Sequence, residues 1–184
     1  MTEYLTSPQR HANMAAIHSK DTKPEMVVRK WLWGHGFRYR LNHPRLPGKP
    51  DIVMRKYRTC IFVNGCFWHG HGVTISSTGK TETETESSEC CKIPKSNTYF
   101  WIKKIQKNQE RDRKVQHELA SMGWHCITIW ECDLKPKVRE QTLNSLAYTL
   151  NKIFLQDHSV RRYVIPEEEP MMAAEEVISK LSEH

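Results

Sequence analysis

Nine consecutive residues, from Val63 to His71, carry an unusual density of side chains that can do chemistry. The sequence is Val-Asn-Gly-Cys-Phe-Trp-His-Gly-His, and its last six residues supply one thiol, two large aromatic rings and two imidazoles. The apolar run just before it, at positions 60–62, predicts a buried strand that ends here. Metal ligation, hydrolysis and base stacking are the three kinds of chemistry that this combination favours.

The cysteines and one histidine are suited to a structural zinc site. Cys66 and His71 lie at the two ends of the segment, Cys90 and Cys91 follow it, and Cys132 comes much later in the chain. One ligand from each place gives a Cys₃His set, which is common in structural zinc sites. The spacing is irregular, so the alternative is that Cys90 and Cys132 are ordinary small residues. Cys90 is favoured slightly over Cys91 as the ligand.

Asp51 and His69 are the candidates for hydrolysis. Asp51 opens an apolar strand after Pro-Gly-Lys-Pro, and one or two carboxylates are enough to hold Mg²⁺ beside a substrate phosphate. His69 is an imidazole that can take or give a proton at neutral pH. The alternatives are a turn aspartate that caps its own loop and a surface histidine with no catalytic role.

Aromatic and basic side chains indicate contact with nucleic acid. Phe67, Trp68 and Trp101 could enter between base pairs or stack on bases, although core packing is the commoner use of such rings. Lys104 belongs to a basic series that recurs every three or four residues, so its members share one helix face and could neutralise phosphates. The rest of that series is Lys107, Arg111 and Lys114. A solvated helix face is the alternative.

The elements that must position these side chains alternate between helix and strand. The pattern predicts a mixed α/β sheet with helices packed on it. The expected helices are 22–34, 97–122 and 141–155, and the expected strands are 37–41, 51–54, 59–63 and 125–130. Phe100, Ile105, Val115, Leu119 and Met122 are the expected core contacts of the long helix.

Length and charge set the broad class of the protein. The chain has 184 residues and a net charge of +7, which suits one domain with a polyanionic partner. We expect an arm at 1–20, a catalytic domain at 21–160 with a flexible insertion at 72–89, and an acidic tail at 161–184. The absence of an apolar signal or span predicts a soluble, cytoplasmic protein.

Several ordered motifs together resemble the very-short-patch-repair (Vsr) DNA mismatch endonucleases. The similarity covers about residues 7–155. It rests on Leu-Pro-Gly-Lys-Pro-Asp at 46–51, Phe-Val-Asn-Gly-Cys-Phe-Trp-His at 62–69, Pro-Lys-Ser-Asn at 94–97, Phe-Trp at 100–101, the charged series at 107–113, Gly-Trp at 123–124 and Trp-Glu-Cys at 130–132. The arm residues Asn13, Met14 and Ile17 are similar too.

The resemblance implies a restriction-endonuclease-like fold of the PD-(D/E)xK type and a nick 5′ to the thymine of a T:G mismatch in double-stranded DNA. Such mismatches arise when 5-methylcytosine is deaminated. Mismatch-repair proteins are further partners that the family implies, and we expect a monomer acting on DNA in the nucleoid. Carried onto this chain, the roles are Mg²⁺ ligation by Asp51 and the Val63 carbonyl, catalysis by Asp51, His69 and Glu25, zinc ligation by Cys66, His71, Cys90 and Cys132, and DNA contact by Met14, Phe67, Trp68, Trp101, Lys104 and Asn108.

Three departures from the family pattern bear on these roles. Val63 replaces a threonine found in some members, Asn64 replaces a second histidine, and the insertion separates His71 from its cysteine partner. Related nucleases often carry an acid and a lysine at the strand positions of Val63 and Gly65, so their absence gives His69 more of the work. The alternatives are a zinc-stabilised mismatch-binding protein without catalysis and a restriction-type nickase of the same fold.

Overall fold

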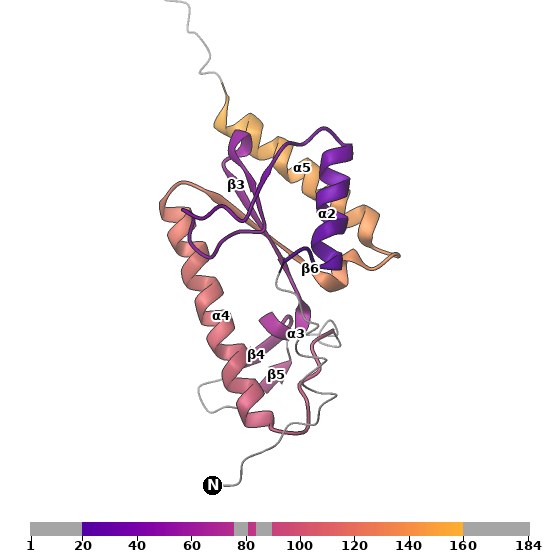
Figure 1. Ribbon diagram of the computed structural model, residues 1–184, viewed down its shortest axis with the longest axis vertical. Helices are drawn as coiled ribbons and strands as arrows, with labels where there is room; N and C mark the ends of the chain where they lie inside the picture. Colours follow the sequence, from indigo (N-terminus) through magenta and orange to yellow (C-terminus); the bar gives the residue numbers. More distant parts are fainter. Residues whose placement is uncertain (1–19, 76–80, 84–89, 160–184) are drawn as a thin grey trace, which may run out of the picture.

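A four-stranded mixed sheet lies at the centre of the protein, seen here in a computed structural model (Figure 1). The strand order is β1-β2-β3-β6, in which β1, β2 and β3 are antiparallel neighbours and β6 runs parallel to β3. The strands are β1 Arg40–Leu41, β2 Ile52–Met54, β3 Thr59–Asn64 and β6 His125–Trp130. This confirms the predicted mixed α/β sheet.

The structure describes residues 20–75, 81–83 and 90–159. Met14 and the rest of the expected arm up to residue 19 lie outside the described residues, as does the acidic tail from 161 to 184. None of the helices in the described ranges has the length and apolar character that crossing a membrane requires.

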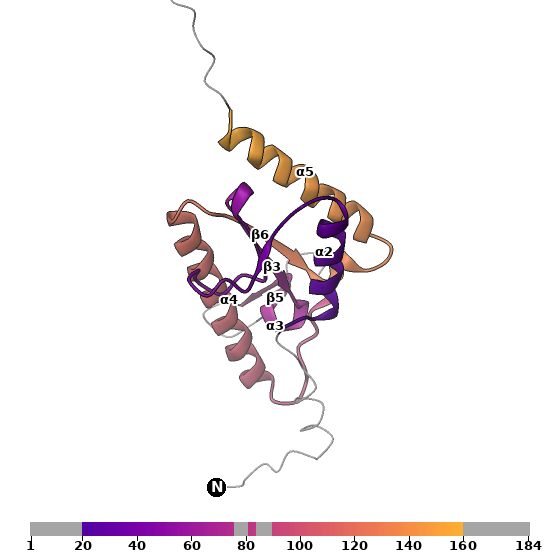
Figure 2. The same cartoon turned by 45° about the horizontal axis from the view of Figure 1, so that its top comes forward.

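Helices cover both faces of the sheet (Figures 1 and 2). The helices α2 and α5 pack on one face against Ile52, Met54 and Ile61, and the helix α4 packs on the other against Val53 and Cys60. Their bounds are α2 Lys23–Gly34, α4 Thr98–Ser121 and α5 Arg139–Asp157. Because both faces are covered, every residue of β2 is buried, as expected for a strand inside a layered α/β fold.

Two of the expected core contacts of the long helix are wrong. Phe100 and Met122 are 59% and 47% exposed, whereas Ile105 and Leu119 are fully buried. Phe100 lies in the first turn of α4, and Met122 caps its far end. The N-terminal half of α4 extends past the end of the four-stranded sheet (Figure 1), so its first turn has no strand of that sheet beneath it, and Met122 lies beyond the last residue of the helix.

A small substructure extends beyond the end of β3, beside the N-terminal half of α4 (Figure 1). It consists of the helix α3 Cys66–His69 and the antiparallel strands β4 Val73–Ile75 and β5 Thr81–Thr83. The expected insertion at 72–89 therefore contains two short strands. Gly65 precedes α3 and Gly70 ends it with a φ of 63°, a left-handed conformation that glycine adopts without strain. This turn shapes the segment from Val63 to His71, which we call the reactive segment.

Candidate active site and metal centre

Asp51 and Val63 meet where the β2–β3 pairing stops. The Val63 N–H donates to Asp51 Oδ2 at 2.8 Å, so the carboxylate takes the place of the next strand residue. Continuing the register from the Ile52–Ile61 pair puts Pro50 opposite Val63, and proline has no N–H to donate. The N–H and C=O of one strand residue point to the same edge. The Val63 carbonyl therefore faces the Asp51 side without a strand donor opposite it.

The electrostatics of Asp51 place two further groups near it. Burial raises the pKa of its carboxyl, and the negative charge of Glu25 raises it further. The Val63 N–H and the positive form of His69 act in the opposite direction. Protein groups therefore stabilise the charged form of Asp51 incompletely, which suits a carboxylate that binds a cation.

Glu25 is buried in the first turn of α2 and is only 3% exposed. Its N–H donates to Thr22 Oγ1 at 3.4 Å, so Thr22 caps the start of the helix. Its carboxylate accepts from Arg29 Nη1 at 3.1 Å, and Arg29 also pairs with Asp21. The guanidinium offsets the cost of burying Glu25 and fixes the carboxylate on the helix side that faces Asp51.

His69 is held by a carboxylate that the sequence did not single out. Its Nδ1 forms a short hydrogen bond with Asp112 Oδ2, and the other carboxylate oxygen accepts from Arg111. Burial raises the pKa of Asp112, but the bonds and charges of His69 and Arg111 outweigh it and hold that pKa below its ordinary value. An ionised Asp112 can only accept, so Nδ1 carries a proton. In the neutral imidazole, Nε2 is then the basic atom.

The signal for Asp112 is present in the sequence, although its charged neighbours obscure it. Trp101, Ile105, Asn108 and Asp112 recur at spacings of four, three and four, so they form one stripe along α4. That stripe faces α3. Lys104 is exposed, and its basic series occupies the neighbouring side of the helix. This charged side drew attention away from the stripe that contains Asp112.

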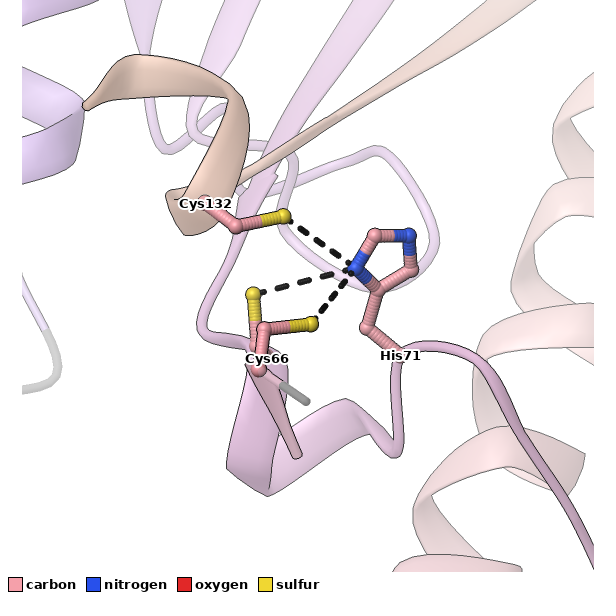
Figure 3. A group of neighbouring side chains, drawn as sticks. Cys66, His71 and Cys132 are labelled. Atoms are coloured by element: carbon pink, nitrogen blue, oxygen red, sulfur yellow. Dashed lines mark hydrogen bonds between the residues drawn. The ribbon is translucent and has the colours of Figure 1, made fainter. Parts of the chain in front are cut away.

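Cys66, His71, Cys90 and Cys132 form the second part of the site, and their ligand atoms all lie within 4.8 Å of one another. Figure 3 shows how Cys66, Cys132 and His71 point toward one another. From His71 Nδ1 the sulfurs of Cys66, Cys90 and Cys132 are 3.8, 3.2 and 3.3 Å away, in that order. A tetrahedral zinc ion with bonds of about 2.0–2.3 Å would separate its nitrogen and sulfur ligands by about 3.6 Å. The four residues therefore fit a metal ion of that size.

The structure separates the two adjacent cysteines. Cys90 Sγ faces the cluster, at 3.2 Å from His71 Nδ1. Cys91 is buried instead against Val73 and Ile105, where burial raises the pKa of its thiol to about 11 and keeps it protonated. Its Sγ donates to the Phe67 carbonyl at 3.9 Å and lies outside the group of four ligand atoms, so the surroundings of Cys91 suit a packing role.

Three aromatic side chains gather beside α3. The ring centroids of Phe67 and Trp68 are 5.2 Å apart, and Trp101 of α4 lies 5.1 and 6.0 Å from them. All three rings are partly exposed. Asn108, expected at the DNA, donates from Nδ2 to the Trp68 carbonyl at 2.7 Å. The structure therefore brings the three rings together in one aromatic cluster at the surface, next to His69.

A buried carboxylate, a carboxylate-held histidine and a surface aromatic cluster around the end of a mixed sheet define a nuclease-like α/β protein. Comparisons with known proteins agree. Residues 2–74 match the family model described as DNA mismatch endonuclease Vsr. The chain is 48% identical over 147 residues to the type II nicking enzyme V.NmeAIP of Neisseria meningitidis serogroup A, a match that covers 79% of this chain and 94% of the relative.

Two further relatives extend the comparison. The DNA mismatch endonuclease Vsr of Escherichia coli K12 is 38% identical, over 73% of this chain and 77% of the relative. The type II nicking enzyme V.XorIIP of Xanthomonas oryzae pv. oryzae is 39% identical, over 73% of this chain and 88% of the relative. The chain belongs to the Vsr DNA mismatch endonuclease family. It is a DNA endonuclease, and DNA is its partner.

Proposed function

We propose that this endonuclease nicks one strand of double-stranded DNA 5′ to the thymine of T:G mismatches that arise from deamination of 5-methylcytosine. The observation that carries the proposal is the placement of His69. Asp112 fixes its ring on α3, where the charge of His69 acts on the Asp51 carboxylate and the neighbouring residues Phe67 and Trp68 belong to the aromatic cluster. The names of the relatives support both halves of the activity, because one is a mismatch endonuclease and others are nicking enzymes.

Asp51 and the Val63 carbonyl are the groups that would hold a catalytic Mg²⁺, with Glu25 close enough to contribute through water. All are oxygen donors, as Mg²⁺ prefers, and the carbonyl faces the carboxylate that would share the ion. The chemistry that a bound Mg²⁺ supplies is polarisation of a phosphoryl oxygen and easier ionisation of water. Because the second ligand is a main-chain atom, valine serves here as well as threonine. This arrangement supports a fold of the PD-(D/E)xK type.

His69 would move the proton in the hydrolysis. With Nδ1 donating to Asp112, Nε2 is the atom that accepts a proton from an attacking water or passes one to the leaving oxygen. Asp112 stays ionised at neutral pH, so it stabilises the imidazolium that forms for a moment. Asn64 is buried at the strand end, and its amide is neither an acid nor a base near neutral pH, so His69 is left to transfer the proton without a second histidine.

Phe67, Trp68 and Trp101 would open the duplex at the mismatch. Inserting rings between base pairs costs a few kcal/mol of unstacking, and the cost is smaller at a mispaired step. Lys104 is exposed on the adjoining side of α4, where it would contact phosphate and so add affinity without sequence preference. Discrimination between T:G and C:G would then come partly from deformability.

Cys66, His71, Cys90 and Cys132 would hold a structural zinc ion. Cys66 starts α3 and His71 follows its last residue by two positions, so the ion would tie both ends of the helix that carries His69. His71 also stacks on Trp130, with ring centroids 4.1 Å apart. Zinc closure compensates for the lack of a large core in this small substructure.

The test is a matched pair of duplexes that differ only in T:G or C:G at one position, incubated with Mg²⁺. We expect one nick, 5′ to the mismatched thymine, and no cut in the C:G duplex. Equal cleavage of both duplexes would contradict mismatch nicking. A gel shift that prefers T:G without any nick would indicate a mismatch-binding protein, and cutting at a fixed sequence without a mismatch would indicate a restriction-type nickase.

We expect Asp112→Asn to slow single-turnover nicking by about a hundredfold, because general acid–base catalysis contributes about 10²–10⁴-fold and depends on the orientation of the ring. Affinity for the T:G duplex should change little. Glu118→Gln is the matched control, because Glu118 lies on the same helix and makes only an exposed ion pair with Lys114. A rate for Asp112→Asn within threefold of the control would remove Asp112 from the mechanism.

A further inference from the structure

The segment from His69 to Val73 links the catalytic histidine to the insertion. It holds the end of α3, the ligand His71 and the start of β4. The cysteine that approaches His71 from the far side of the insertion, Cys90, is 19 residues away. A short loop would restrain His69 through its own closure. Here the insertion removes that closure, so contacts with another element can add to the restraint that the metal ligands would supply.

Two neighbouring amides of α4 supply it. Gln109 Nε2 donates to the Gly70 carbonyl at 3.1 Å and to the Val73 carbonyl at 2.9 Å. Asn108 Nδ2 donates to the Trp68 carbonyl at 2.7 Å. The Asn108 bond satisfies a carbonyl in the last turn of α3, which lacks a partner within so short a helix. The Gly70 carbonyl also accepts from the Val73 N–H at 3.1 Å, so the two Gln109 bonds join the end of α3 to the start of β4. Both hydrogen bonds that the Gln109 amide donates therefore go to this one segment.

The packing beneath these bonds is close. A Cβ on Gly70 would lie 2.4 Å from Ile105 Cγ2 and 2.7 Å from Gln109 Nε2, so only glycine lets the segment approach α4 this far. Ile105 is 1% exposed and Val73 is buried beside it. Donors shielded in this way matter more than exposed ones, because water cannot easily replace them.

We propose that Gln109 is a positioning residue that clamps the segment between His69 and His71 onto α4. The clamp fixes the position of His69 relative to the scissile phosphate. This inference rests on the proposed function of His69. Asp112 orients the ring of His69 from one side, and Gln109 holds the backbone that carries it. The clamp acts on the segment from α4, in addition to the metal cluster, whose ligand Cys90 follows the long insertion. Gln109 bonds main-chain carbonyls and not the ring of His69, so its role is to position the histidine.

Gln109→Met tests the clamp, because methionine has nearly the same length but no donor. Gln116→Met is the matched control: Gln116 lies two turns along the same helix and donates to Thr128 Oγ1 at 3.1 Å, away from α3. We expect single-turnover nicking of the T:G duplex to fall at least about tenfold in Gln109→Met, since small misplacements of catalytic groups carry costs of up to about a hundredfold. DNA affinity and melting temperature should match those of the control.

Backbone hydrogen exchange gives a readout that needs no activity. Peptides covering residues 66–75 should exchange at least about tenfold faster in Gln109→Met than in wild type, and Gln116→Met should leave them unchanged. If exchange in this segment does not change, the clamp is overturned, whatever the protein cuts. A slower nick shared equally by both variants would also overturn it. If wild type fails to nick T:G while exchange responds, the proposed function fails and the clamp stands.

Discussion

Asp51→Asn should slow nicking by at least about a thousandfold while the protein keeps its affinity for the mismatched duplex. A metal ion contributes several kcal/mol of transition-state stabilisation, and each 1.4 kcal/mol is about tenfold in rate. Asp51 is the one carboxylate bonded to the Val63 N–H, beside the carbonyl that would share the ion. Affinity should persist because protein–DNA contacts fall mainly on phosphates and come from other residues.

The same substitution should not destabilise the protein. Burial raises the pKa of Asp51, so the folded protein binds its proton more tightly than the unfolded chain does. Between the ordinary pKa and the raised pKa, the folded protein holds a proton that the unfolded chain has released, so the free energy of unfolding falls as pH rises through that range and stays lowered above it. The neutral asparagine carries no such charge. Without added magnesium, urea denaturation at pH 8 should find Asp51→Asn at least as stable as wild type.

Asp157→Asn is the matched control for Asp51→Asn. Asp157 pairs with His125 at the far end of α5, away from the site, and its loss should leave the nicking rate unchanged. Single-turnover rates and gel shifts on the T:G duplex give both quantities for both variants. A rate for Asp51→Asn within tenfold of wild type would mean that the metal is held elsewhere. Loss of DNA binding in step with the rate would mean that Asp51 shapes the DNA surface.

The residue types of the reactive segment predicted much of the site, because few folds gain from placing a thiol, two imidazoles and two large aromatics together. Short apolar runs then located the strands of the sheet. Ile52 and Met54 face one helical layer and Val53 faces the other, so β2 is apolar throughout. These features depend on chemistry and on local repeat, and both can be read from a single sequence.

Features that depend on long-range orientation could not be predicted in the same way. Asp112 is 43 residues from His69 and lies among charged neighbours, so its place on the stripe with Trp101 and Ile105 gives the side of the helix but not the partner of its carboxylate. The helix α3 has only four residues between two glycines, and so short an element has no periodicity to detect. Phe100 looked like a core residue because apolar spacing gives the side of a helix but not where its covering sheet ends.

The pair Cys90 and Cys91 shows the same limit most sharply, because the two residues are identical and adjacent and only the direction of each side chain tells them apart. We expect Cys90→Ser to lose zinc and Cys91→Ser to keep it. Loss of a direct ligand should weaken zinc binding by more than the roughly 10- to 100-fold caused by removing an outer hydrogen-bond partner. Cys91→Ser should only lower stability, by about 1 kcal/mol or more, because it buries a hydroxyl in an apolar position.

Zinc content by elemental analysis and the absorption of cobalt-substituted protein measure both variants directly, since cobalt thiolate bands report the number of sulfur ligands. The opposite pattern would make Cys91 the ligand, and zinc retained in both would show that the cluster is not the metal centre. Nicking should fall with zinc content in Cys90→Ser. Cys66 and His71 lie at the two ends of the segment that carries His69, so a metal bound by them would also order the helix α3.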